Sequence, residues 1–372
     1  MMSNYSPLIS VIIPFYNSRF DYFIYAINTV LCQSYKNWEV IIVNDGSTFE
    51  NKIFLEDYIS NLNDRRISIL HLDKNHGPST AYNKGIESAS GEIITWLDSD
   101  DLYLPWYFEK VTDFFLNNSD CSVLFIPVLF YLSLWKIKRI HIHYSCTKAL
   151  EEKEDLKNLL TEIKQGTLSL FPLPFFKREA FKKISFDPDI RLGEDNDLYC
   201  QIFNNDELLN RAKVASFAGY LYRIYPSTSR ITHRKDLRFQ DMEKIINKYK
   251  NKNSLATNNI KAMQARNDIW KFCHLLNDYL QDGSLINYFK NVLSEFKSLK
   301  DRIKSIRVLL NMFFIYNFLV PMFGIGSKYK DMLFSLRGNK YKKIKSMFIN
   351  YLNKLENEDE ITKLNKAYEG IF

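Results

Sequence analysis

Three carboxylates lie within four residues of this chain, in the segment LDSDDL. Asp98, Asp100 and Asp101 directly follow the apolar run 93–97, so they are expected at the end of a buried strand. Such a cluster is costly unless water or a cation compensates its charge, and a hard divalent cation that also binds phosphate oxygens commonly does so. The alternative is an acidic turn that caps the next helix, expected over residues 102–117.

Apolar runs alternate with helical patterns through the first part of the chain. Strands are expected at 8–13, 38–43, 67–72 and 93–97, and helices at 20–34, 49–62 and 79–88. Strands and helices that alternate at intervals of roughly 30 residues indicate βαβ units and a mostly parallel sheet. Ligands bind beyond the carboxyl ends of such strands, where Tyr16, Asp45 and the acidic cluster all fall.

The next part of the chain adds strands and one acidic helix. The uncharged run 121–135 contains Pro127 and is too short for a membrane span, so it predicts a buried strand with a bend. Residues 194–203 predict a helix whose first turn holds three acidic residues, which suit the positive end of the helix dipole. Residues 214–225 predict another strand.

The composition describes a globular protein with a sizeable core. Of the 372 residues, 46% are hydrophobic and 15% aromatic, which suits one large domain and a smaller one. Five scattered cysteines without CxxC spacing indicate reduced thiols and a cytoplasmic protein. No basic stretch precedes the first apolar run, so a secretory signal is not expected.

Positive charge gathers in the last third of the chain. Residues 241–372 carry +10 and residues 1–240 carry −3, which gives the net charge of +7. From about residue 235 the pattern is helical with lysines on the outer face. This pattern suits a solvated helical bundle. It equally suits a region whose residues 300–350 make peripheral contact with the inner face of an anionic membrane. Aromatic stripes here favour core packing, so no nucleic acid partner is expected.

Four motifs in register resemble glycosyltransferase family 2 with the GT-A fold, of the bacterial surface-polysaccharide type. They are VIIPFYN, NDGS, KNHGPSTAYNKGIESASGEIITWLDSDD and GEDNDL, which occur in the family's order within roughly residues 6–230. The resemblance implies an α/β fold with a Rossmann-like, mostly parallel central sheet flanked by helices. It implies a nucleotide-sugar-binding catalytic domain over 1–235, followed by a basic, mainly helical domain over 236–372.

The resemblance also implies a reaction. The expected enzyme is an inverting glycosyltransferase that moves a hexosyl or N-acetylhexosaminyl group in cell-surface polysaccharide synthesis, such as capsule or lipopolysaccharide. Its partners would be a nucleotide-sugar donor, with a UDP-sugar favoured, and a glycan or lipid-linked acceptor. A divalent metal, Mn²⁺ or Mg²⁺, would be held by Asp100 and Asp98, with Asp98 alternatively on the ribose. The alternative function is a non-catalytic nucleotide- or glycan-binding protein of the same fold, against which the intact acidic clusters argue.

Catalytic and donor-binding roles follow residue by residue from the resemblance. Glu194 and Asp195 are the catalytic candidates; Asp195 is our choice for the base that takes the acceptor's proton, although spacing does not decide between them. Tyr16 would pack on the nucleotide base, with core filling as its structural alternative. Asp45 would accept the N–H of that nucleotide base, with an Asx turn as its structural alternative. Contacts to the nucleotide sugar are implied for Pro14, Tyr16, Asn17, Asp45, Lys74, Asn75, Gly77, Asn83, Asp98, Ser99 and Arg223.

The chain departs from its relatives at two positions. Many relatives carry arginine where this chain has Tyr82, so a cation near the diphosphate must come from Lys74, Lys84 or elsewhere. Relatives often have histidine where Tyr225 stands. The remaining phosphate-contact candidates in that loop are Arg223, Ser227, Ser229 and Arg230.

Overall fold

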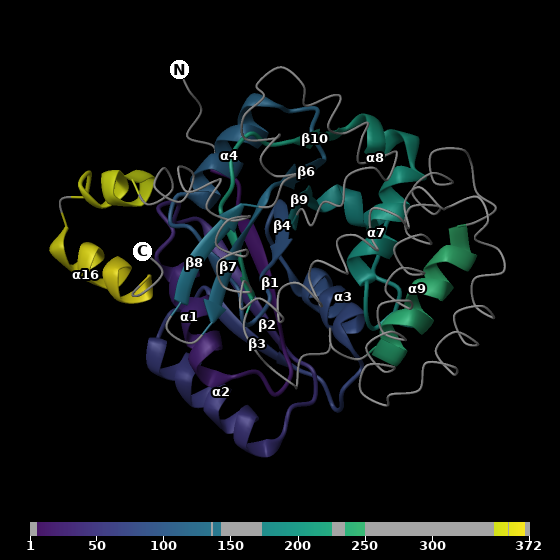
Figure 1. Ribbon diagram of the computed structural model, residues 1–372, viewed down its shortest axis with the longest axis horizontal. Helices are drawn as coiled ribbons and strands as arrows, with labels where there is room; N and C mark the ends of the chain where they lie inside the picture. Colours follow the sequence, from purple (N-terminus) through teal and green to yellow (C-terminus); the bar gives the residue numbers. More distant parts are fainter. Residues whose placement is uncertain are drawn as a thin grey trace, which may run out of the picture. The chain divides into compact units, whose positions relative to one another are not determined.

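The apolar runs of the sequence form the strands of a central sheet in the computed structural model (Figure 1). Residues with a described structure are 6–134, 137–142, 173–224, 235–249, 346–355 and 357–368. All of them belong to one of two compact units, which comprises residues 1–260 and 343–372. The expected domain boundary near residue 235 stays a prediction, and most of residues 300–350 lie outside the described part of the chain.

Four parallel strands form one half of the central sheet, in the order β3-β2-β1-β4. They are β1 (Ile9–Phe15), β2 (Trp38–Asn44), β3 (Ile67–His71) and β4 (Ile93–Trp96). The connecting helices are α1 (Phe20–Leu31), α2 (Phe49–Leu62) and α3 (Pro78–Ser88). These bounds confirm the expected βαβ units to within a few residues.

The other half of the sheet is mixed. Strand β9 (Leu173–Lys177) lies antiparallel between β4 and β6 (Val123–Ile126), and β10 (Ala212–Val214) pairs parallel with β6 at the edge. The sheet is therefore mostly parallel and flanked by helices, as the sequence predicts.

Helices cover both faces of the sheet because side chains alternate along each strand. Residues Val11 and Ile13 of β1 pack in the core formed with α1, α2 and α4 (Tyr107–Asn117). Ile12 packs in the opposite core, formed with α3, α7 (Glu194–Phe203) and α8 (Asp206–Asn210). A Cβ at Gly85 of α3 would lie 2.4 Å from Cγ2 of Ile12, so glycine permits this close approach.

A second sheet of four strands, in the order β5-β11-β7-β8, stands beside the first. Its strands are β5 (Leu102–Tyr103), β11 (Tyr220–Ile224), β7 (Val128–Leu134) and β8 (Ile137–Ile142). Pro127 separates β6 from β7, which confirms the bend expected there. The expected start of α4 at residue 102 is wrong, because Leu102 and Tyr103 pair with β11 and the helix begins at Tyr107.

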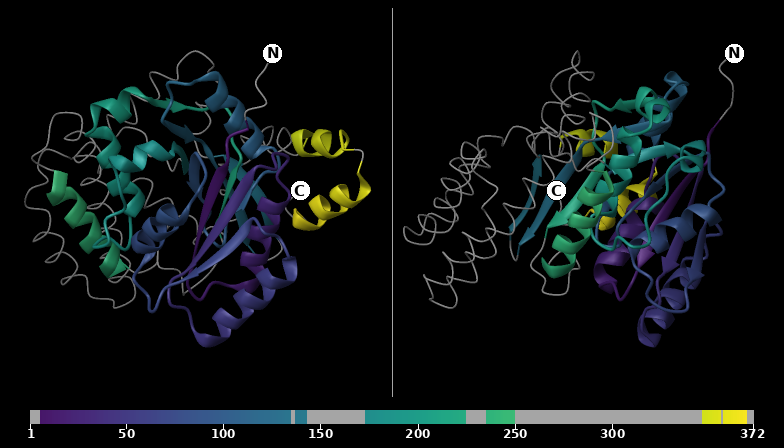
Figure 2. Two further views of the ribbon diagram at one scale, coloured as in Figure 1. Left: turned by 180° about the vertical axis from the view of Figure 1, so that it is seen from behind. Right: turned by 90° about the vertical axis from the view of Figure 1, so that its right-hand side faces the viewer.

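Residues near the end of the sequence belong to the same unit and pack against α1 and against the segment that leads into α4. Helix α16 (Glu358–Ala367) contacts α1, and the hydroxyl of Tyr368 donates to the carbonyl oxygen of Tyr103. The ring of Tyr351 meets that of Trp106 edge-on at 5.8 Å between centroids. Figure 2 shows α16 (yellow) beside α1, on the side of this unit away from α9 (Lys235–Tyr249; green). Within the described ranges, no helix is long and apolar enough to cross a lipid bilayer.

Candidate active site at the ends of β1 and β4

The carboxyl ends of β1 and β4 meet where the order of the parallel strands reverses. Strands β2 and β3 extend the sheet to one side of β1, and β4 lies on its other side. Such a switch point is where open α/β sheets bind ligands. Residues 16–18 follow β1 here, and residues 98–101, which we call the DSDD turn, follow β4.

Hydrogen bonds join the loops that follow β1, β2 and β4. Asn17, at a φ of 47°, accepts at Oδ1 from the backbone N–H of Thr48 at 2.9 Å, and its own N–H donates to Oγ of Ser47 at 3.0 Å. The hydroxyls of Ser18 and Ser99 share a hydrogen bond of 2.6 Å. Tyr16, which precedes Asn17 in the loop after β1, is 51% exposed, so core filling does not explain its aromatic ring. Its role against a base stays a prediction.

Asp45 organises the turn that leads into α3. Its carboxylate is 3% exposed and accepts from the N–H of His76 at 2.8 Å, the N–H of Gly77 at 2.8 Å and Nδ2 of Asn75 at 2.9 Å. Burial raises the pKa of Asp45, against the opposing effect of these N–H donors. The turn at Gly46 is closed by Asn44 instead, whose Oδ1 accepts from the Ser47 N–H at 3.1 Å. Asp45 therefore shapes the expected donor loop; its bond to a base stays a prediction.

Tyr82 supplies a neutral hydrogen-bond donor at the position where the resemblance leads us to expect a cation. Its hydroxyl donates to Oδ1 of Asp98 at 2.7 Å, and its ring stacks on that of Phe186 at 4.7 Å between centroids. Burial, and then the charges of Asp98 and Glu194, raise the pKa of Tyr82 well above its ordinary value. The hydroxyl thus keeps its proton and holds Asp98.

Asp101 differs from its neighbours in the DSDD turn. It is fully buried and accepts from the hydroxyl of Tyr220, which lies 119 residues later in the sequence. It also accepts from the N–H of Arg223 at 2.7 Å. Burial raises the pKa of Asp101 well above its usual range, and the charges of Asp100 and Asp98 add to this. Asp101 therefore fastens the DSDD turn to β11, while Asp98 and Asp100 remain partly exposed.

Glu194 and Asp195, which we call the acidic pair, open α7 and lie near Asp98. Oδ1 of Asp195 accepts from the backbone N–H and from Nδ2 of Asn196, at 2.8 and 2.9 Å. Burial raises the pKa of Glu194 to about 8, with further contributions from the charges of Asp195 and Asp98. Charge effects weaken with distance, so β4 and α7 deliver their carboxylates to one site. The sequence interpretation depended on this juxtaposition.

The raised pKa of Glu194 predicts a pH-dependent stability. In the unfolded chain this carboxyl titrates near 4.5, whereas in the folded chain it does so near 8. Between these values the folded chain binds the extra proton, so the free energy of unfolding should fall as pH rises from about 4.5 to about 8. Urea unfolding at about pH 5 and about pH 8, with a chelator present, should show this fall in the unmodified chain and a smaller one in Glu194→Gln. An equal fall in both proteins would contradict it.

Several other expected donor contacts have structural partners. Both amide atoms of Asn83 bond to the backbone of Phe186, at 2.8 and 3.0 Å. Lys84 pairs with Glu87 at 2.8 Å on the exposed side of α3, and Pro14 lies within β1 opposite Val43. Lys74 belongs to the loop that passes close to Gly46. Other expected phosphate contacts, Ser227, Ser229 and Arg230, and also Tyr225, lie outside the described residues.

The carboxylates of Asp98 and Asp100 suit a metal ion that binds together with phosphate groups. Asp98 and Asp100 are two partly exposed hard oxygen donors on one turn. Across the described ranges, no group of three or more His, Cys, Asp or Glu side chains could hold a metal ion. Mg²⁺ commonly binds through one or two carboxylates and completes its shell with substrate phosphates and water, so these residues fit such an ion.

Comparison with known proteins identifies the same family that the sequence motifs resemble. The family model described as Glycosyl transferase family 2 matches residues 10–184. The putative teichuronic acid biosynthesis glycosyltransferase TuaG of Bacillus subtilis is 40% identical over 124 residues, which are 33% of this chain and 48% of that protein. The minor teichoic acid biosynthesis protein GgaB of B. subtilis is 29% identical over 219 residues, 58% of this chain and 23% of that protein. The chain thus matches about half, or less, of these relatives' length.

Solved structures share the fold at low sequence identity. Residues 1–349 of S. aureus TarS superpose with a TM-score of 0.52 at 20% identity, over 77% of this chain and 79% of that chain. The same protein in complex with UDP-GlcNAc gives a TM-score of 0.51 at 21% identity, over 82% of this chain and 78% of that chain. These likenesses confirm the expected fold class.

Proposed function

We propose that the chain, whose residues 10–184 match the Glycosyl transferase family 2 model, is a member of that family and transfers a sugar from a nucleotide sugar to a growing cell-wall polymer. The observation that carries the proposal is the meeting of Asp98 with the acidic pair at the switch point of the sheet. The names of TuaG and GgaB support an acceptor of the teichuronic or teichoic acid kind. UDP-GlcNAc, present in the TarS complex, is the first donor to test.

Donor binding would use the loops after β1, β2 and β4. The exposed ring of Tyr16 stacks on the base, and the turn ordered by Asp45 places the N-terminus of α3 towards the diphosphate. Asp98 and Asp100 would hold Mn²⁺ or Mg²⁺. Such an ion, when bound, neutralises the diphosphate and stabilises the leaving nucleotide. Tyr82 fixes the orientation of Asp98 through its hydroxyl.

The acidic pair would move the proton of the acceptor. Asp195 takes the hydroxyl proton as the acceptor oxygen forms its bond to the anomeric carbon, and the bond from that carbon to the nucleotide diphosphate breaks. Attack from the face opposite the nucleotide inverts the anomeric centre. The two hydrogen bonds from Asn196 orient the carboxylate of Asp195. Glu194, with a pKa of about 8, keeps its proton near neutral pH and donates to the sugar.

The membrane-side expectations remain part of this proposal. A lipid-linked acceptor and peripheral contact of residues 300–350 with an anionic inner membrane surface both rest on the basic charge of residues 241–372.

Nucleotide release from a donor panel tests the function. The full chain with Mn²⁺ should release nucleotide diphosphate from UDP-GlcNAc or from another UDP-hexose, faster when a polyol-phosphate or glycan acceptor is added. A chelator should stop the release and added Mn²⁺ restore it. Binding of UDP in calorimetry without release from any donor would favour the non-catalytic alternative instead.

A further inference from the structure

The segment that enters α7 is held by side chains of α9. We call residues 187–193 the approach segment, because they lead directly to the acidic pair. The approach segment ends at Gly193, whose φ of 90° precedes a helix N-terminus without a side-chain cap. The backbone N–H groups of Arg191 and Leu192 donate to Oδ2 of Asp241 on α9, at 2.9 and 3.1 Å. Asp241 is fully buried, so its carboxylate satisfies two backbone N–H groups that lie just before α7 begins.

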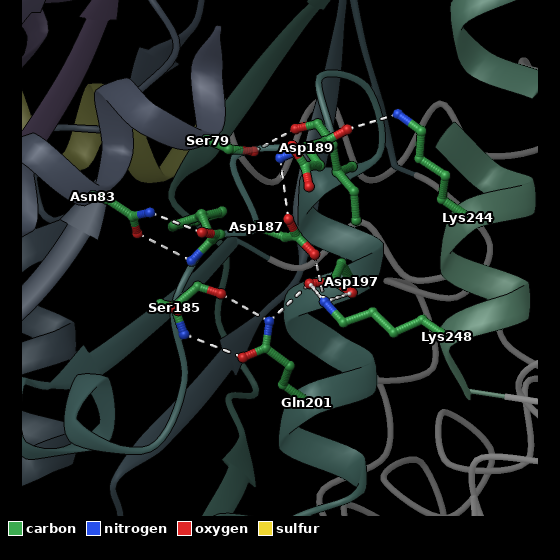
Figure 3. A network of polar contacts seen from close by, with 11 residues as sticks. Ser79, Asn83, Ser185, Asp187, Asp189, Asp197, Gln201, Lys244 and Lys248 are labelled. Atoms are coloured by element: carbon green, nitrogen blue, oxygen red, sulfur yellow. Dashed lines mark hydrogen bonds and ion pairs between the residues drawn. The ribbon is translucent and has the colours of Figure 1, made fainter. Parts of the chain in front are cut away.

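Lys248 of α9 ties the approach segment to α7 itself (Figure 3). Its Nζ lies 2.7 Å from Oδ2 of Asp187 in the approach segment and 3.0 Å from Oδ1 of Asp197 in α7. Asp197 is fully buried and also accepts from Nε2 of Gln201 at 2.8 Å. Burial lowers the pKa of Lys248, but its bonds to the two carboxylates outweigh this and raise it. A buried carboxylate of this kind needs its cation.

The contacting residues of α9 share one face. Asp241, Lys244 and Lys248 are spaced by three and four residues, so they lie on the same side of the helix. Nζ of Lys244 binds Oδ1 of Asp241 at 2.7 Å and the carbonyl oxygen of Asp189 at 2.8 Å. Lys244 and Lys248 are exposed, as the expected outer-face lysines should be, and they also make these polar contacts with the approach segment and with α7.

The other side of the approach segment touches α3. Oγ of Ser79 donates to the carbonyl oxygen of Ile190. A Cβ built on Gly77, in the turn shaped by Asp45, would lie 3.3 Å from Cγ of Arg191. The approach segment thus lies between the expected donor loop and α9, and a shift at Arg191 would displace the acidic pair three residues later.

We propose that α9 is a positioning element for catalysis: Asp241 and Lys248 hold the approach segment so that the acidic pair faces Asp98. The expected effect of α9 on turnover rests on the proposed function, whereas the contacts by which α9 holds the approach segment do not. Outer-shell residues that orient metal ligands are worth roughly 10- to 100-fold in activity, and we expect a loss of the same order from α9. The donor loop makes its own contacts through Asp45, so donor affinity should be largely unaffected.

Kinetics of α9 variants of the full chain test the positioning role. Asp241→Asn and Lys248→Met should each lower kcat roughly 10- to 100-fold, with the KM for UDP-GlcNAc within about twofold. Lys248→Arg should restore most of the loss, since it keeps the charge that the two carboxylates require. The matched control is Lys52→Met, which removes an exposed ion pair with Glu56 on α2 and should leave kcat unchanged.

Hydrogen exchange tests the structural part without any turnover. In Asp241→Asn, the amides of Arg191 and Leu192 should exchange faster while those of β1 and β4 keep their protection. Unchanged exchange at 191–192 would overturn the proposal, and so would faster exchange there with an unchanged kcat. If the unmodified chain releases nucleotide from no donor, the proposed function fails, and the exchange result alone decides whether α9 holds the approach segment.

Discussion

Replacing Asp195 with asparagine should lower kcat for sugar transfer by roughly 10²- to 10⁴-fold, the range expected for loss of a general base. The amide keeps the size of the side chain and can still accept from Asn196, but it cannot take the acceptor's proton. Nucleotide release with acceptor present measures the effect, and calorimetry with UDP and Mn²⁺ should show unchanged donor binding. Asp57→Asn, the same change at an exposed position of α2, serves as the control.

The same assay decides which member of the acidic pair is the base. Glu194→Gln imitates the protonated form that Glu194 adopts at neutral pH, so it should retain far more activity than Asp195→Asn. The reverse order would assign the proton transfer to Glu194. Activity close to that of the unmodified chain in both variants would remove the acidic pair from the mechanism.

Replacing Asp100 with asparagine should reduce transfer by about 10³-fold and raise the Mn²⁺ concentration needed for half-maximal rate. A divalent ion held by Asp98 and Asp100 would supply several kcal/mol of charge stabilisation at the leaving diphosphate, and each 1.36 kcal/mol corresponds to about a tenfold change in rate. Nucleotide release measured against Mn²⁺ concentration shows both effects.

The neighbouring Asp101 provides a matched contrast for Asp100. Asp101→Asn makes the same chemical change one residue away, in a buried side chain bonded to Tyr220 and Arg223. It should lower Tm, because a buried hydrogen-bonded group is disturbed, while the apparent affinity for Mn²⁺ stays the same. An unchanged Mn²⁺ requirement in Asp100→Asn would show that Asp100 does not hold the ion.

Local sequence patterns predicted the parallel strands and their connecting helices well, because the signals for these elements lie within short segments. In α1 the buried residues Phe23, Ala26, Ile27 and Val30 recur at helical spacing. The parallel strands are buried on both faces and so appear as continuous apolar runs. The start of α7 was also predicted correctly, since Gly193 and the acidic first turn mark it.

Contacts between distant segments account for what the sequence did not reveal. Asp101 belongs to the acidic cluster that suggested a cation. In the structure it accepts hydrogen bonds from the Tyr220 hydroxyl and the Arg223 N–H, and so it joins the DSDD turn to β11. Asn83 is expected to contact the donor, which stays a prediction, and the sequence did not reveal that its amide bonds to the backbone of Phe186, 103 residues later. Asp241 and Lys248 carried no motif, because their partners are backbone N–H groups and carboxylates of another segment. Such pairings depend on tertiary approach, which residue spacing does not encode.

The contacts of Tyr368 with Tyr103 of β5 and of Tyr351 with Trp106, just before α4, have a consequence for biosynthesis. A ribosome completes α4 roughly 230 residues before it reaches Phe348, which at about 5–20 residues per second is a delay of roughly 10–50 s. During that interval the nascent chain exposes Trp106 and the neighbouring apolar surface, which Tyr351 and Tyr368 later cover. Chaperone binding to ribosome-bound chains should therefore persist until the final helix emerges.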